Sequence, residues 1–242
     1  MITDRQKNIL NELVKLYINN AKPVSSELLE EKSKLDFCPA TIRGEMKRLT
    51  DMGYLKQPHT SAGRVPTNKG YRFFVDSLNT DINSGINFEF ESINDDLKLI
   101  ETITRNMALL SSSLVFTYLN DKDFLWKDGW KEVFNNPEFK EPDFLSEFLE
   151  TVDHFEKNIK KFNEEADQIR VYIGDEKPFQ AEDFSLIISK TRFPNQDGIL
   201  AILGPNRMAY DKNIELINSL IKEISFLSNA FNAFSIIDWT CS

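Results

Sequence analysis

The stretch Cys38–Ser77, CPATIRGEMKRLTDMGYLKQPHTSAGRVPTNKGYRFFVDS, constrains the fold more than any other part of the chain. Pro39 suits the first turn of a helix, and apolar residues then recur at i, i+4 and i+7. Gly53 can supply the left-handed residue that ends such a helix. A short hairpin with its tip at Pro58–Gly63 follows, and then an amphipathic helix that Thr67 can cap. The pattern predicts helix, hairpin and helix in succession.

Two further helices are expected before this stretch. Thr3 and Gln6 have the spacing of a capping box at the start of an amphipathic helix. Ser25 or Ser26 can cap a short second helix after Pro23. Three helices, a β-hairpin wing and a fourth helix account for residues 1–79 with short connections. This order is typical of a winged-helix DNA-binding domain, in which the third helix enters a groove of the duplex.

The exposed face of that third helix carries donors suited to DNA. Arg43 is the candidate for a base contact, since a guanidinium can bond the O6 and N7 atoms of guanine together. A solvated charge or an ion pair is the alternative role. Lys47 and Arg48 are better suited to phosphates, which position a protein without specifying sequence, and Thr41 lies on the same face.

The wing and the second helix supply further candidates. His59, Thr60, Ser61 and Arg64 are expected at the wing tip, where a phosphate could receive them, although a lone histidine is often only a surface residue. Amides at the start of the second helix could hold a phosphate, or its serines could simply cap it. The predicted DNA-binding set is Ser25, Ser26, Thr41, Arg43, Lys47, Arg48, His59, Thr60, Ser61, Arg64, Lys69 and Arg72.

The charge distribution favours DNA binding by the N-terminal part alone. The chain has 242 residues and a net charge of −9. Residues 1–79 contain 13 Lys and Arg against 9 Asp and Glu, whereas the remainder contains 16 against 29. A cationic head and an acidic body are therefore expected, with DNA confined to the head.

Several classes of function find no support in the residues. The two cysteines, Cys38 and Cys241, have no metal-ligand spacing, and no P-loop, Gly-x-Ser-x-Gly or GxGxxG run occurs. Cys38 as a redox sensor would lack a resolving partner. No segment approaches a membrane span, and the N-terminus has no apolar leader. We expect a cytoplasmic, non-enzymatic protein without metal or cofactor.

The remainder of the chain predicts a second domain, over residues 93–242, after a linker at 80–92. A helix from about residue 93 precedes a buried strand at Leu114–Leu119, and residues 120–168 suggest short helices, the clearest from Pro142. Strand-like segments at 169–173, 184–190 and 198–203 and a long helix follow. The fold class is therefore α+β, with a sensor-like second domain of PAS or GAF type.

The motif QPHTSAGRVPTNKGYRFFVDSL, with PATIRGEM before it, resembles the hallmark of the HrcA family of bacterial heat-inducible transcription repressors. The similarity resumes at 173–176 and at 204–210. The resemblance implies a winged-helix domain and a GAF-like domain with a dimerising insert. This chain is shorter than most members, and the shortfall is expected between Leu119 and Ile169, which predicts a reduced GAF-like domain with a helical insert.

Two residues depart from the family pattern. Gly44 stands where members commonly have Asn, so either a bare backbone approaches the groove closely or a base contact is lost. Cys38 stands where a serine often caps the third helix.

Three hypotheses follow for the whole chain. The first is a homodimeric repressor that binds an inverted repeat; the resemblance implies the CIRCE operator before chaperone genes and support by the chaperonin GroEL. The second is a regulator that senses a small molecule through its GAF-like domain. The third is an interaction module whose head binds DNA only loosely. The many Phe and the two Trp of residues 120–168 are expected to fill a core, and some of them to join two subunits.

Overall fold

The computed structural model describes residues 2–33, 35–78, 88, 95–165, 169–193 and 196–237. It divides into one unit of Met1–Leu78 with Asn206–Met208, and a second of Asn79–Pro205 with Ala209–Ser242. The first unit is called the head and the second the body. The predicted linker, except for Phe88, and Cys241 lie outside the described residues.

The head contains the predicted helices and wing in the predicted order. Its elements are α1 (Asp4–Asn20), α2 (Ser26–Lys32), α3 (Pro39–Asp51), β1 (Leu55–Lys56), β2 (Val65–Pro66) and α4 (Asn68–Asp76). The strands β1 and β2 are antiparallel, and the loop between them forms the wing. This arrangement confirms the winged-helix fold.

Side chains cap three of these helices as their spacing predicts. The Thr3 and Gln6 pair forms the capping box: Thr3 Oγ1 accepts from the Gln6 N–H at 3.3 Å, and Gln6 Oε1 accepts from the Thr3 N–H at 3.0 Å. Ser25 Oγ accepts from the Leu28 N–H at 3.1 Å, and Thr67 Oγ1 accepts from the Gly70 N–H at 3.2 Å. Each cap satisfies an amide that the first helical turn leaves without a partner.

The base of the wing is joined to the segment before α2. The N–H of Val24 donates to the Arg64 carbonyl at 2.9 Å, and the N–H of Arg64 donates to the Val24 carbonyl at 2.8 Å. Gly63 permits this close approach, because a Cβ atom there would lie 2.3 Å from the carbonyl oxygen of Val24. The wing, α2 and α3 are thus held around one space.

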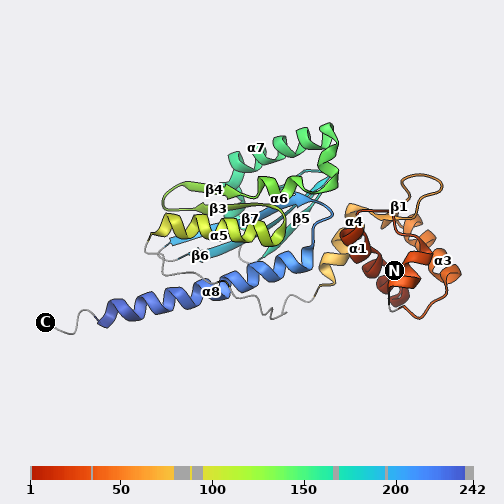
Figure 1. Ribbon diagram of the computed structural model, residues 1–242, viewed down its shortest axis with the longest axis horizontal. Helices are drawn as coiled ribbons and strands as arrows, with labels where there is room; N and C mark the ends of the chain where they lie inside the picture. The colour runs from red at the N-terminus through yellow and green to blue at the C-terminus, as the bar shows by residue number, and fades with distance from the viewer. Residues whose placement is uncertain are drawn as a thin grey trace. The chain divides into compact units, whose positions relative to one another are not determined.

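The body is a five-stranded antiparallel sheet with helices on both faces. The strand order is β4-β3-β7-β6-β5. In Figure 1, α7 lies over one face of the sheet, and α5 and α8 lie over the other. The elements are α5 (Asp96–Ser111), β3 (Leu114–Leu119), β4 (Phe124–Asp128), α6 (Trp130–Phe134), the 3-10 helix η1 (Pro137–Lys140), α7 (Pro142–Glu165), β5 (Arg170–Ile173), β6 (Phe184–Phe193), β7 (Gln196–Pro205) and α8 (Tyr210–Ile237).

Aromatic residues of α7 fill one side of the sheet. Phe148, Phe155 and Phe162 are buried against inward residues of the central strands. The rings of Phe116 and Phe155 meet edge to face, with centroids 5.0 Å apart. Core filling, the role expected for most of these residues, is confirmed for these three. The helix–sheet–helix layers agree with a GAF-like domain and with the expected α+β class.

Covering both faces also explains the sequence of the central strands. β3 is buried at every position, so it is a continuous apolar run rather than an alternating one. On the face of α5, Thr104 and Thr117 are buried and their hydroxyl oxygens lie 2.7 Å apart, so each polar group has a partner.

The sequence interpretation is wrong in part for residues 120–168. The segment contains β4, which pairs with β3 as an edge strand, before the helices begin. All five residues of β4 are half-buried, so the alternation that predicts a strand is missing.

The helix α5 also differs from what its apolar periodicity predicts. Leu97 and Leu110, which continue that periodicity, are exposed rather than in the core.

We predict that Gly44→Ala stabilises the head by about 1 kcal/mol, because alanine is the better residue in a helix interior. A Cβ atom at Gly44 would meet no atom within 4 Å, so space does not oppose the change. All three tryptophans lie beyond the head (126, 130 and 239), so hydrogen exchange of peptides from α3 is the suitable measurement. Exchange should slow.

Gly63→Ala is the matched control and should accelerate exchange, because its Cβ atom would collide with the backbone of Val24. Faster exchange in Gly44→Ala would contradict the prediction.

Candidate nucleic-acid interface

A groove of about 360 Å³ lies between α2, α3 and the wing. It brings together residues that are far apart in the sequence but share one polar surface. Its lining is mostly hydroxyl, amide and guanidinium groups, with one carboxylate. The lining residues are Ser25, Ser26, Glu27, Arg43, Met46, Gln57, Thr60, Ser61, Ala62, Gly63 and Arg64. Six of the predicted DNA-binding residues therefore surround one groove.

Arg43, the candidate for a base contact, lies at this groove in an ion pair. Its guanidinium donates to the carboxylate of Glu27, and the two side chains are 71 % and 58 % exposed. The pKa of Glu27 lies below its usual range, first because its own backbone N–H donates to the carboxylate and then because the Ser25 hydroxyl does; Arg43 adds a smaller effect. Glu27 is therefore ionised at neutral pH, and any anionic ligand has to compete with it for Arg43.

Gly44 and Lys47 lie on the exposed side of α3, opposite its buried residues Ile42, Met46 and Leu49. Lys47 has no hydrogen bond or ion pair with any residue that the structure describes. Its ammonium group is thus available to a phosphate.

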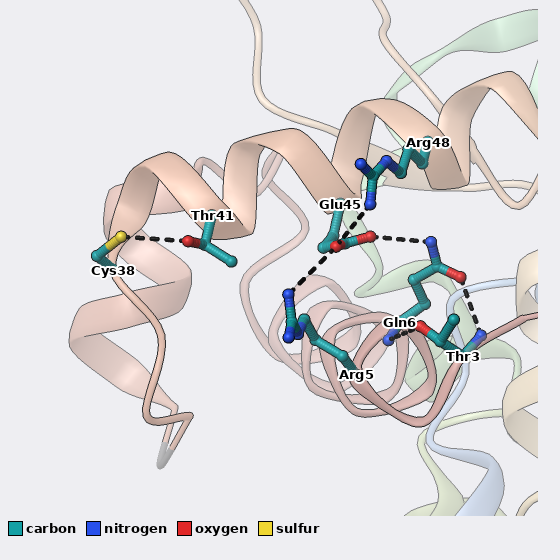
Figure 2. Close-up of polar contacts among 7 residues, drawn as sticks. All are labelled: Thr3, Arg5, Gln6, Cys38, Thr41, Glu45 and Arg48. Atoms are coloured by element: carbon teal, nitrogen blue, oxygen red, sulfur yellow. Dashed lines mark hydrogen bonds and ion pairs between the residues drawn. The ribbon is translucent and has the colours of Figure 1, made fainter.

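Arg48 and Thr41 occupy the flank of α3 that faces α1. Arg48 Nη1 donates to Glu45 Oε1 at 3.0 Å, as Figure 2 shows. The Thr41 hydroxyl lies 3.3 Å from the sulfur of Cys38. This contact is the main reason why the pKa of the Cys38 thiol is lowered, with the Thr41 backbone second. Cys38 makes no side-chain hydrogen bond that caps α3.

The wing loop is held by an amide side chain. Gln57 Nε2 donates to the carbonyls of Thr60 and Ala62, at 2.8 and 2.9 Å. His59 and Ser61 are exposed, with Ser61 Oγ 3.4 Å from Nδ1 of His59. These side chains point out from a loop whose backbone is fixed locally.

Arg64 lies at the base of the wing and not at its tip, which corrects the sequence interpretation. Its backbone pairs with Val24, and its Nε donates to Thr50 Oγ1 on α3 at 3.1 Å. Arg64 therefore links the wing to α3 along the wall of the groove.

The two candidates on α4 make contacts within the head. Lys69 Nζ donates to the carbonyl of Met52 at 2.8 Å and lies 4.3 Å from the centroid of the Tyr54 ring. Lys69 therefore satisfies a carbonyl group at the C-terminal end of α3. Arg72 Nη1 donates to Asp76 Oδ1 at 3.3 Å on the same helix. Both residues lie outside the lining of the groove.

Sequence reasoning missed two polar side chains of the groove, Glu27 and Gln57. Glu27 was unremarkable as an acid in the first turn of a helix, and its pairing with Arg43 over 16 positions is a tertiary contact. Gln57 directly follows β1, and its role in holding the wing loop appears only in the folded structure. Among the described residues, no group of three or more His, Cys, Asp or Glu is arranged to hold a metal ion. No described helix has both the length and the apolar character that spanning a membrane requires.

The fold and the groove define a winged-helix DNA-binding protein. Residues 1–79 match the family model "Winged helix-turn-helix transcription repressor, HrcA DNA-binding", and residues 73–214 match the model "HrcA protein C terminal domain". The chain belongs to the HrcA family.

Similar proteins bear the name heat-inducible transcription repressor HrcA. The one from Brevibacillus brevis is 55 % identical over 78 residues, which cover 32 % of this chain and 23 % of that relative. The one from Thermoanaerobacter sp. is 28 % identical over 338 positions, covering 96 % of this chain and 98 % of the relative. That alignment therefore contains at least 96 positions, 338 minus 242, where this chain has no residue.

The fold is also similar to a crystal structure of a protein described as hypothetical. The two chains superpose with a TM-score of 0.76 at 21 % identity, over 94 % of this chain and 98 % of the other. This likeness concerns the fold alone.

We predict that Glu27→Gln increases the affinity for mixed-sequence DNA several-fold between about pH 6 and pH 8. The change removes an anion from the groove and frees Arg43, so the dependence of log K on log salt should steepen by about 0.9. Fluorescence anisotropy with a labelled duplex at several NaCl concentrations measures both quantities.

Glu12→Gln on α1, where Glu12 pairs with Lys15 outside the groove, is the control for the change of charge. Equal effects of the two variants would contradict a specific role for Glu27.

Proposed function

We propose that the chain is a homodimeric transcription repressor that inserts α3 of each subunit into a half-site of an inverted repeat. A two-fold dimer matches the symmetry of such an operator. Membership of the HrcA family supports repression as the activity. The action is one of binding rather than catalysis, and it takes place in the cytoplasm, where bacterial DNA lies.

The arrangement of cations around α3 is the observation that carries this proposal. Arg43 faces the groove beside the wing, Lys47 projects from the exposed face, and Arg48 occupies the opposite flank. A helix in a major groove has base edges before it and a phosphate backbone on either side. Arg43 is suited to a base edge, and Lys47 and Arg48 are suited to phosphates.

Exposed leucines of the body support self-association. Leu97, Leu109 and Leu110 on α5 are exposed, as are Phe134 on α6 and Leu149 on α7. Contiguous exposed apolar residues mark contacts between proteins, and Leu109 and Leu110 are adjacent on α5. The expectation that aromatic residues of 120–168 join two subunits stays a prediction for Phe134.

The target genes and the chaperonin belong to the same proposal. Since the relatives are named heat-inducible repressors, we place the operator, the CIRCE element, before chaperone genes. GroEL would keep the repressor active, and heat would divert GroEL to unfolded proteins. This feedback requires a head of marginal stability, to which Gly44 contributes by lowering helix propensity.

The ligand-sensing regulator and the loosely binding interaction module stay predictions. A small molecule that raises the melting temperature of the body would support the first. A protein that binds duplex DNA without protecting a symmetric site would support the second.

A footprint tests the proposed function. Genomic fragments bound by the purified protein are selected, sequenced and then footprinted, with and without GroEL. We expect an inverted repeat protected on both halves, and a larger active fraction when GroEL is present. Fragments without a symmetric motif would contradict the dimeric repressor.

We predict that Lys47→Gln weakens binding to every duplex by a similar factor and lowers the salt dependence by about one unit, since a phosphate contact carries no sequence information. Titrations of the selected operator and of a mixed-sequence duplex at several salt concentrations test this.

Lys15→Gln on α1 is the control for lost charge, because Lys15 lies outside the groove. If Lys47→Gln affected only the operator, Lys47 would contact a base instead.

A further inference from the structure

Glu45 on α3 is the one charged side chain that is buried among the described residues. A buried carboxylate needs partners for both oxygens, because removing it from water is costly. Glu45 Oε2 accepts from Gln6 Nε2 at 2.9 Å, and its Oε1 accepts from Arg48 Nη1 at 3.0 Å. Arg5 Nη1 of α1 lies 3.7 Å from the same Oε1 atom.

The direction of the bond from Gln6 shows that Glu45 must present an acceptor to it. Gln6 Oε1 already accepts from the N–H of Thr3 in the capping box, so its amide nitrogen must face Glu45 as a donor. All the neighbouring groups of the Glu45 carboxylate in Figure 2 are thus donors. The buried anion links the start of α1 to the middle of α3.

Both arginines, in contrast, are open to solvent. The side chains of Arg5 and Arg48 are 51 % and 68 % exposed, whereas that of Glu45 is 7 % exposed. The guanidinium of Arg5 also lies 5.3 Å from the ring centroid of Phe37, just before α3. Arg5 is therefore held beside α3 by two contacts, while its remaining donors can reach a ligand.

The position of this pair complements the groove at the wing. Arg43 and Arg48 are five residues apart, which separates them by about 140° around the helix axis. Arg43 lies at the groove with the wing, and Arg48 lies on the flank toward α1 with Arg5. Gly44 and Lys47 face outward between them.

We propose that Arg5 is a further DNA-backbone contact, that Arg5 and Arg48 each hold a phosphate on the groove edge away from the wing, and that Glu45 is the residue that positions them. The inference rests on the proposed function, since it requires that α3 enter the major groove. Glu45 does not touch DNA; it directs two guanidinium groups to the same side of α3.

The test measures the affinity of the full chain for a mixed-sequence DNA duplex by anisotropy at several NaCl concentrations. Arg5→Gln should weaken binding and reduce the slope of log K against log salt by about 0.9, the value for one phosphate. Lys15→Gln removes the same charge from α1 but should leave the slope unchanged. An equal slope for Arg5→Gln and Lys15→Gln would overturn the phosphate contact.

Glu45→Gln separates positioning from charge. Removing an anion would by itself tighten DNA binding, whereas loss of positioning should weaken it and lower the slope by up to about 1.8, for two contacts. A partly unfolded head would lower the affinity by one factor at every salt concentration and leave the slope intact. Tighter or unchanged binding, or weaker binding with the slope of the unsubstituted protein, would overturn the positioning role.

The double variant Arg5→Gln with Glu45→Gln should lose no more slope than Glu45→Gln alone, because Arg5 is then already displaced. Failure of the unsubstituted protein to bind any duplex at low salt would overturn the proposed function and this inference together. Normal binding with an unchanged slope in Arg5→Gln would overturn the inference alone.

Discussion

The packing of α3 against α1 is the constraint on which the head depends. Ile42 and Leu49 are fully buried there, and Glu45 on the same side accepts a hydrogen bond from Gln6 on α1. Apolar burial is strong but has no direction, so it resists separation of the helices better than it resists their sliding. The bond between Gln6 and Glu45 adds that direction, because it joins two particular turns. The bond and the buried residues together fix which face of α3 is exposed to solvent.

The packing of α3 against α1 and α2 also arranges the charges around it. Arg43 is paired with Glu27 and Arg48 with Glu45, while Lys47 between them has no partner among the described residues. Arg43 has to give up Glu27 when it meets an anion of the duplex, so part of the attraction to any DNA is offset. Such competition lowers indiscriminate binding and favours sites where additional contacts form. The acidic body reinforces this effect by repelling the duplex.

Local signals predicted the head well because each of its boundaries has its own chemistry. Thr3, Ser25 and Thr67 cap their helices through short-range hydrogen bonds, and Gly53 follows α3 with a positive φ of 77°. β4 was not predicted, because it lacks such local signals. It is an edge strand whose residues are all half-buried, and its place in the sheet depends on pairing with β3 rather than on any local pattern.

The sequence by itself determined the winged-helix order and the family and supplied the candidate cations, because periodicity, capping and motif spacing act over a few residues. Only the tertiary structure decided which cations share a surface and which acids oppose them. Arg64 belongs to the base of the wing and Lys69 to the end of α3, whereas Glu27 and Glu45 hold arginines on the two flanks of α3. These relations join positions up to 40 residues apart, as Arg5 and Glu45 are, and they exist only once the helices have packed.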